Sequence, residues 1–215
     1  MAVAVKICGV NTPEALGAAA RAGAAYVGLL FYPPSPRAVT PAQAAALARQ
    51  APPGVQTVGV IVDPDDATLD EIVAQVPLDL LQLHGSETPR RVAAIKARFA
   101  VPVMKAIKVA TAEDFAAVEG YGQVVDRLLF DAKAPKTMTD AMPGGNAVAF
   151  DWRLLAGRTW PRPWLLSGGL NPENLAEAVN ISGAPAVDTS SGVEDEPGRK
   201  SPAKIAAFLD VANSL

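Results

Sequence analysis

The side chains with the clearest chemical potential follow short apolar runs along the chain. They are one thiol, one imidazole and three carboxylates: Cys8, His84, Asp63, Asp131 and Asp188. A thiol and a carboxyl group that face one another can act as the base and the acid of a proton-transfer reaction. One histidine and one cysteine are too few for a zinc or iron site, so we expect no metal.

Two turns near the end of the chain combine Gly with Ser and could bind an anion. They occupy residues 167–171 and 189–192, and their candidate phosphate-binding residues are Gly168, Gly169, Ser190, Ser191 and Gly192. Small residues let backbone N–H groups approach a phosphate closely. The alternative is ordinary turn chemistry, because Gly and Ser also mark loops that bind nothing.

Segments typical of strands and helices alternate along the whole chain. The expected strands are 3–8, 25–31, 56–62, 78–85, 102–107, 124–131, 164–167 and 184–188. Each expected strand precedes a helix start signal, at 12–13, 40–41, 63–64, 86–89, 111, 151, 171–173 and 201–202. Residues 132–149 show no clear periodicity and are expected to form a long loop. Strict alternation predicts a parallel sheet. Eight units of about 27 residues, without Gly-x-Gly-x-x-Gly after the first strand, favour a closed (β/α)8 TIM barrel over an open doubly wound sheet.

No linker interrupts this alternation, so we expect residues 1–215 to form one domain. In a barrel of this kind the active site lies at the carboxyl ends of the strands. All the side chains named above lie at or just after those ends, and the two Gly-Ser turns lie at the ends of the seventh and eighth strands. That is the usual phosphate site of the fold.

The first strand places Lys6 and Cys8 on one face, because side chains alternate with a period of two. We hypothesise that Lys6 lies inside the barrel and biases Cys8 toward the thiolate, since a nearby positive charge lowers the pKa of a thiol. Lys6 would then need a partner of its own, either an inward carboxylate or Gln82. The alternative for Cys8 is a small buried hydrophobic residue.

The overall composition indicates a globular chain, with 50% hydrophobic and 19% charged residues. A net charge of −3 without a basic run argues against nucleic acid or an anionic membrane as a partner. No apolar run is long enough for a membrane span. A single cysteine cannot form an internal disulfide, which fits the reducing cytoplasm.

Short motifs in a fixed order carry a family resemblance that spans nearly the whole chain. They are Lys6-Ile7-Cys8-Gly9, Pro33-Pro34-Ser35-Pro36-Arg37, Val58-Gly59-Val60, Gln82-Leu83-His84-Gly85, Leu129-Phe130-Asp131, Phe150-Asp151-Trp152, Leu166-Ser167-Gly168-Gly169-Leu170, and Val187-Asp188 with Ser190-Ser191-Gly192-Val193-Glu194. On these residues the chain resembles the phosphoribosylanthranilate isomerases of tryptophan biosynthesis, which use no cofactor.

The resemblance implies an Amadori rearrangement, an aldose–ketose isomerisation of N-(5-phosphoribosyl)anthranilate to 1-(2-carboxyphenylamino)-1-deoxyribulose 5-phosphate. It implies that Cys8 is the general base and Asp131 the general acid. It also implies that Arg37 and Asp188 contact the anthranilate end of this small-molecule substrate. The family usually has Gly-Gly-Thr-Gly where this chain has Gly-Gly-Asn-Ala at 144–147, a departure that bears on ligand contacts of that loop.

Each candidate also has a reading without catalysis. Asp131 and Asp188 could cap backbone N–H groups, and Arg37 could be a solvated surface residue. His84 is either a hydrogen-bonded structural histidine or a substrate contact. Asp63 before Pro64 is expected to cap a helix. The acidic run 194–196 is expected to be a solvated loop face.

Two rival functions remain at this level. The related sugar isomerase of histidine biosynthesis shares the fold and the chemistry, but resemblance to it implies an Asp in place of Cys8. A barrel that binds phosphate without catalysis is the second rival. The sequence leaves open whether the protein is a monomer or a homodimer.

Overall fold

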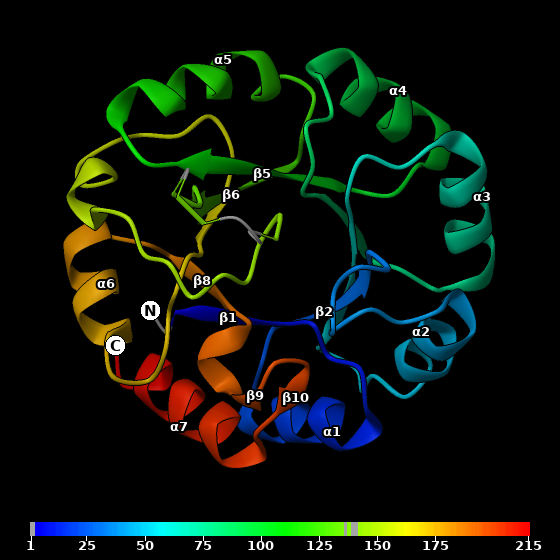
Figure 1. Cartoon of the computed structure of the whole chain (residues 1–215), viewed down its shortest axis with the longest axis horizontal. Coiled ribbons are helices and arrows are strands. Elements are labelled where there is room, and N and C mark those ends of the chain that lie inside the picture. Colours follow the sequence, from blue (N-terminus) through cyan, green and yellow to red (C-terminus); the bar gives the residue numbers. More distant parts are fainter. Residues whose placement is uncertain (1–2, 136, 139–141) are drawn as a thin grey trace.

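The computed structural model describes residues 3–135, 137–138 and 142–215, in which eight parallel strands close into a barrel with helices outside (Figure 1). The strands are β1 Ala4–Cys8, β2 Tyr26–Phe31, β3 Gln56–Ile61, β4 Leu80–Leu83, β5 Val103–Val109, β6 Arg127–Ala132, β7 Trp164–Leu166 and β8 Ala186–Thr189. They follow the chain around the barrel, and β8 pairs with β1. The predicted TIM barrel is confirmed.

Helices connect the strands on the outside of the barrel (Figure 1). They are α1 Pro13–Ala22, α2 Pro41–Ala48, α3 Asp66–Gln75, α4 Pro89–Phe99, α5 Ala117–Tyr121, α6 Leu175–Ser182 and α7 Pro202–Asn213, with 3-10 turns at Ala112–Ala116 and Trp152–Leu154. Thr12, Thr40 and Thr88 each accept a backbone N–H at a helix start, with Pro next in the chain. These pairs are the start signals that the sequence displays.

Strand alternation separates two apolar cores. The outer core fills the layer between strands and helices, and includes Ile7, Leu83 and Phe130. The smaller inner core fills the barrel, and includes Leu80, Met104, Leu129 and Leu165. Residues that alternate with the outer set point into the barrel, so the inward face ends in polar side chains at the carboxyl edge.

Two helix starts differ from the expected positions. The cap of α3 is Asp65, whose side chain accepts from the N–H of Thr68. Asp63, which we expected to cap this helix, instead has a φ of +43° and accepts from the N–H of Ser86. The prediction for Asp63 was wrong because a second Asp stands two residues later. Similarly, α6 starts after Asn174 rather than at 171–173.

The segment after β8 is more structured than the loop that the sequence suggested. A 3-10 turn at Ser191–Val193 leads into a hairpin of β9 Glu194–Glu196 and β10 Arg199–Lys200. Asp195 and Glu196 are exposed as expected, but Glu194 is buried. The expectation of a solvated run was therefore wrong for Glu194, because the hairpin turns its side chain toward Arg37.

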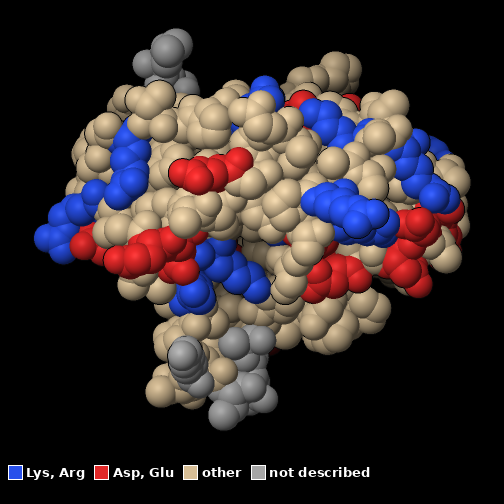
Figure 2. All heavy atoms as spheres, turned by 90° about the horizontal axis from the view of Figure 1, so that it is seen from above, with Lys and Arg blue, Asp and Glu red and all other residues tan. Residues whose placement is uncertain are grey.

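The surface bears charges of both signs. On the face shown in Figure 2, Lys and Arg side chains are interspersed with Asp and Glu. None of the helices in the described part of the chain is long and apolar enough to cross a membrane.

Candidate active site

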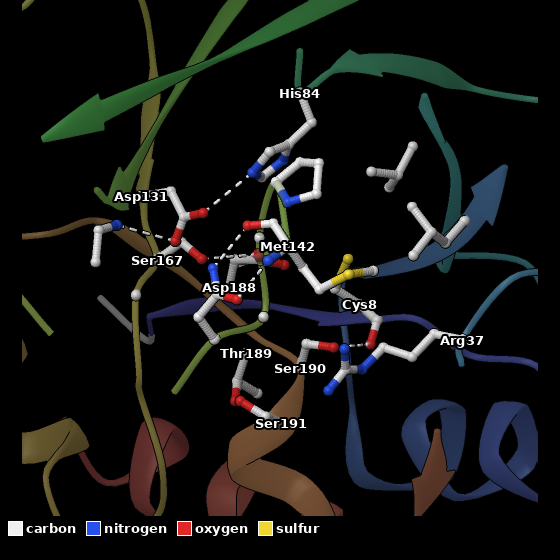
Figure 3. A pocket seen from close by; sticks show the side chains of 18 of the residues that line it. Cys8, Arg37, His84, Asp131, Met142, Ser167, Asp188, Thr189, Ser190 and Ser191 are labelled. Carbon is white, nitrogen blue, oxygen red and sulfur yellow. Dashed lines mark hydrogen bonds and ion pairs between the residues drawn. The ribbon is translucent and has the colours of Figure 1, made fainter. Parts of the chain in front are cut away.

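A cavity at the carboxyl ends of the strands gathers nearly all the predicted site residues (Figure 3). Its empty volume is about 770 Å³, including the open mouth. The predicted residues that line it are Cys8, Arg37, His84, Asp131, Gly168, Gly169, Asp188, Ser190 and Ser191. Asp63 does not line it, and Gly192 lines a second cavity beside it, which shares Gly169 and Ser191 with the first. The thiol and the acid thus open into the same space.

Cys8 ends β1 at the edge of this cavity and lies next to Lys6. A Cβ added at Gly28 would lie 3.0 Å from the sulfur of Cys8 and 3.1 Å from Nζ of Lys6, so the glycine leaves room for both. Burial raises the pKa of the Cys8 thiol, the charge and hydrogen bond of Lys6 oppose this, and Asp188 adds to the rise. The net direction is upward, so the free protein favours the neutral thiol.

Lys6 is completely buried inside the barrel, as the strand parity predicts. Its ammonium donates to Oδ1 of Asp188 at 2.7 Å, and Ser167 donates to Oδ2 of the same carboxylate at 3.0 Å. The partner of Lys6 is therefore an inward carboxylate, not Gln82. Burial works to lower the pKa of Lys6, but Asp188 and Cys8 outweigh it and raise the pKa. Lys6 keeps its charge beside the thiol.

Asp131 lies on β6 across the cavity and belongs to a hydrogen-bonded row (Figure 3). Its Oδ2 is 3.0 Å from Nε2 of His84, and its Oδ1 accepts from the N–H of Ala132. Nδ1 of His84 lies 2.7 Å from Nε2 of Gln82. Gln82 and His84 are two residues apart at the end of β4 and share its inward face. Sequence reasoning did not connect Gln82 with His84, although that spacing gave the signal.

Arg37 is buried rather than solvated. Its Nε and Nη2 donate to the two carboxylate oxygens of Glu194, each at 2.8 Å. Lys200 donates to Oε1 of Glu194 at 2.6 Å and to the carbonyl of Ser190 at 3.0 Å. Burial works to raise the pKa of Glu194, but these two cations hold it below its usual range. Sequence reasoning missed Glu194 and Lys200, because the pairing depends on the hairpin.

The loop after β6 covers the acid side of the cavity. A Cβ at Gly144 would lie 2.8 Å from Nε2 of His84 and 3.2 Å from Oδ2 of Asp131, and one at Gly145 would lie 2.9 Å from Nη1 of Arg37. The family departure lies in this segment. The Asn146 side chain bonds both the N–H and the carbonyl of Met142, and Ala147 has a φ of +55°. Positions 136 and 139–141 of the expected loop 132–149 lie outside the described residues.

The two Gly-Ser turns meet at the rim formed by the ends of β7 and β8, next to the loop after β6. Gly168 and Gly169 have φ of +96° and +64°, a region open to Gly at little cost. Ser190 donates its hydroxyl to the carbonyl of Cys8 at 3.0 Å, which connects this rim to the end of β1. Gly192 packs against the carbonyl of Leu170, where a side chain would not fit. In the described ranges, no group of three His, Cys, Asp or Glu residues is arranged to hold a metal ion.

Comparison with known proteins gives a consistent result. Residues 5–211 match the model of the family described as N-(5'phosphoribosyl)anthranilate (PRA) isomerase. The N-(5'-phosphoribosyl)anthranilate isomerase of Rhodospirillum centenum is 61% identical over the full length of both chains. That of Paracoccus denitrificans is 58% identical over 97% of this chain and 96% of its own.

Solved structures agree with the sequence comparisons. The crystal structure of phosphoribosyl anthranilate isomerase from Thermotoga maritima superposes with a TM-score of 0.88 at 36% identity, covering 99% of this chain and all of that one. A phosphoribosyl anthranilate isomerase in complex with reduced 1-(o-carboxyphenylamino)-1-deoxyribulose 5-phosphate gives a TM-score of 0.83 at 33% identity, with the same coverage. The chain therefore belongs to the N-(5'-phosphoribosyl)anthranilate isomerase family.

Proposed function

We propose that this protein converts N-(5-phosphoribosyl)anthranilate to 1-(2-carboxyphenylamino)-1-deoxyribulose 5-phosphate in tryptophan biosynthesis. Family membership supports the reaction, and the complex of a relative with the reduced product supports a phosphoribosyl ligand. The observation that carries the proposal is local. Cys8 and Asp131 come from strands on different sides of the barrel and line one cavity.

In the proposed reaction, Asp131 donates a proton to the ribose ring oxygen. The bond between that oxygen and C1 breaks, and the nitrogen lone pair forms a protonated Schiff base at C1. The thiolate of Cys8 then removes the proton from C2, and the electron pair moves toward nitrogen to give an enolamine. Transfer of the enol proton to C1 yields the ketone. Acid and base are two separate groups, as opposite protonation states require.

Lys6 supports the thiolate in this scheme. It is a cation paired with Asp188 and within hydrogen-bonding reach of Cys8, so it favours the charged form of the sulfur. Asp188 holds Lys6 in place while it lines the cavity, where we propose that it also contacts the anthranilate end. A bound substrate would displace the remaining water from the part of the cavity next to Cys8.

We propose that Arg37 recognises the anthranilate carboxylate through Nη1. Nε and Nη2 of Arg37 already donate to the carboxylate of Glu194. Nη1 lies next to Gly145 at the cavity, where it can reach a ligand. The phosphate is proposed to bind at Gly168, Gly169, Ser190 and Ser191, with Gly192 shaping the turn from behind.

We propose that His84 lines the substrate-binding cavity and acts through its hydrogen bond with Asp131, and that it is not a second general acid.

We further propose that residues 1–215 work as one catalytic domain, supported by the closure of all eight strands into one barrel. A free thiol as the base fits a reducing compartment such as the cytoplasm.

A bacterial tryptophan auxotroph that lacks this isomerase tests the proposal. The wild-type gene should restore growth without tryptophan, whereas Cys8→Ala and Asp131→Asn should not, although both variants accumulate as folded protein. A histidine auxotroph that lacks the related sugar isomerase should not be rescued. Folded wild-type protein that rescues neither strain would favour the phosphate-binding barrel without catalysis.

A further inference from the structure

Gln82 is buried inside the barrel, and only one end of its side-chain amide has a hydrogen-bond partner among the described residues. Its side chain has no exposed surface, and its Nε2 lies 2.7 Å from Nδ1 of His84. Its Oε1 is buried without a hydrogen-bond partner in the described part of the chain. Buried amides usually have both ends satisfied, so an orphaned oxygen in a catalytic barrel requires an explanation.

The amide of Gln82 can face His84 in two ways, because a turn of 180° about its last torsion exchanges oxygen and nitrogen. With Nε2 toward the ring, Nδ1 must accept, so neutral His84 carries its proton on Nε2 and donates it to Asp131. With Oε1 toward the ring, Nδ1 carries the proton and Nε2 becomes an acceptor. Either orientation keeps one hydrogen bond to Nδ1.

The two orientations have opposite consequences for Asp131. When Nε2 of His84 donates, Oδ2 accepts from His84 and Oδ1 accepts from the N–H of Ala132, an arrangement suited to a carboxylate. When Nε2 accepts, Oδ2 can carry a proton and donate it to His84. A general acid needs the second arrangement, because it must hold a proton before the substrate ring opens.

We propose that Gln82 is a positioning residue that accepts from Nδ1–H of His84 and thereby lets Asp131 keep its proton. The inference rests on the proposed function, in which Asp131 is the acid. When the substrate is bound, the hydroxyl of Asp131 turns from Nε2 to the ring oxygen and gives up its proton there. Asp131 becomes a carboxylate. After the product has left, Asp131 regains a proton from water and Cys8 releases to water the proton that it took from C2.

None of the charged groups described near this row contacts Nδ1 of His84 in place of Gln82. Lys6 and Asp188 form their own pair across the barrel beside Cys8, and Arg37 is bound to Glu194. On the neighbouring strand, Lys108 stands in register with Asp131, and Lys105 pairs with Glu87 on the outer side. The group in contact with Nδ1 is the neutral amide.

Nitrogen NMR tests the tautomer directly, because His84 is the only histidine in the sequence. The wild-type protein, labelled with 15N-histidine, is measured free and with the reduced product analogue bound. Protonated and unprotonated ring nitrogens resonate far apart. We expect a neutral ring protonated on Nδ1 in the bound form. A ring protonated on Nε2, or on both nitrogens, in that form would overturn the proposal.

Gln82→Met provides the kinetic test, since it preserves volume but cannot accept from Nδ1. Leu80→Met, one inward position deeper on β4, is the matched control. We expect kcat to fall about 10-fold and the acidic limb of its pH profile to move about one pH unit lower, with KM unchanged. An equal loss in both variants, or a loss without movement of the limb, would show a merely structural role. Failure of the proposed function would instead appear as an inactive wild type.

Discussion

The two sides of the cavity differ in the charge that lies next to the catalytic group. The base side, formed by β1 and β8, contains a buried ion pair between Lys6 and Asp188 next to the Cys8 sulfur. The acid side, formed by β4 and β6, contains the row of Gln82, His84 and Asp131, in which the group farthest from the cavity is an uncharged amide. A thiolate needs a nearby cation, whereas a carboxyl group that must hold a proton needs none.

The largest expected effect comes from breaking the base side. Lys6→Met leaves the carboxylate of Asp188 buried without its cation, so we expect the free energy of unfolding to fall by about 3–5 kcal/mol. Denaturant titration measures this loss. The double variant Lys6→Met/Asp188→Asn removes both charges and should regain most of the stability. Equal stability of the single and double variants would contradict the coupling.

The Lys6→Met variant also tests the effect of Lys6 on the pKa of Cys8. The ultraviolet absorbance of the thiolate should show a higher pKa for Cys8 in Lys6→Met than in the wild type, because the neighbouring cation is gone. An unchanged titration would mean that Lys6 only fills the barrel.

A smaller effect is expected from Glu194, which fixes the orientation of Arg37. Glu194→Gln breaks the bidentate contact and should raise KM about 10-fold, equivalent to roughly 1.4 kcal/mol, with little change in kcat. Glu196→Gln, in the same hairpin but exposed, is the control and should behave as the wild type. A fall in kcat at constant KM would place Glu194 in the chemistry instead.

The pH profile reveals the asymmetry between the two sides. A carboxyl group ordinarily titrates near 3.9 and a thiol near 8.5, and burial raises the pKa of Cys8 further. Activity needs the thiolate of Cys8 and the protonated carboxyl group of Asp131, so the rate is proportional to the thiolate fraction times the protonated carboxyl fraction. That product is flat between the two pKa values and falls outside them. We expect log(kcat/KM) to stay flat through neutral pH and to decline on the alkaline side above about pH 8.5. A decline that begins near neutral pH would contradict a thiol with a raised pKa.

The smallest effect concerns the covering loop. Ala147 has a φ of +55°, where a side chain is strained and Gly is not. Ala147→Gly should raise the free energy of unfolding by up to about 1 kcal/mol, the balance of relieved strain and a more flexible unfolded chain. Ala149→Gly, two residues away with no positive φ, should destabilise instead.

Sequence periodicity could predict the barrel and the base side, because both depend on local pattern. Alternation alone places Lys6 beside Cys8 and turns both inward. The Arg37 cluster could not be predicted this way, because Glu194 reaches Arg37 only through a hairpin formed after β8. Asp63 shows a related limit, since Asp65 competes for the same cap and Asp63 binds Ser86 in the next loop.

The most direct test of the account is a comparison of kcat/KM with ligand affinity for wild type, Cys8→Ala and Asp131→Asn. Both variants should lose on the order of 10²–10⁴-fold in kcat/KM for N-(5-phosphoribosyl)anthranilate. Calorimetry should show that both still bind the reduced product analogue within a factor of about three of the wild type. Turnover that survives either substitution would contradict the claim that this thiol and this acid act together across the cavity.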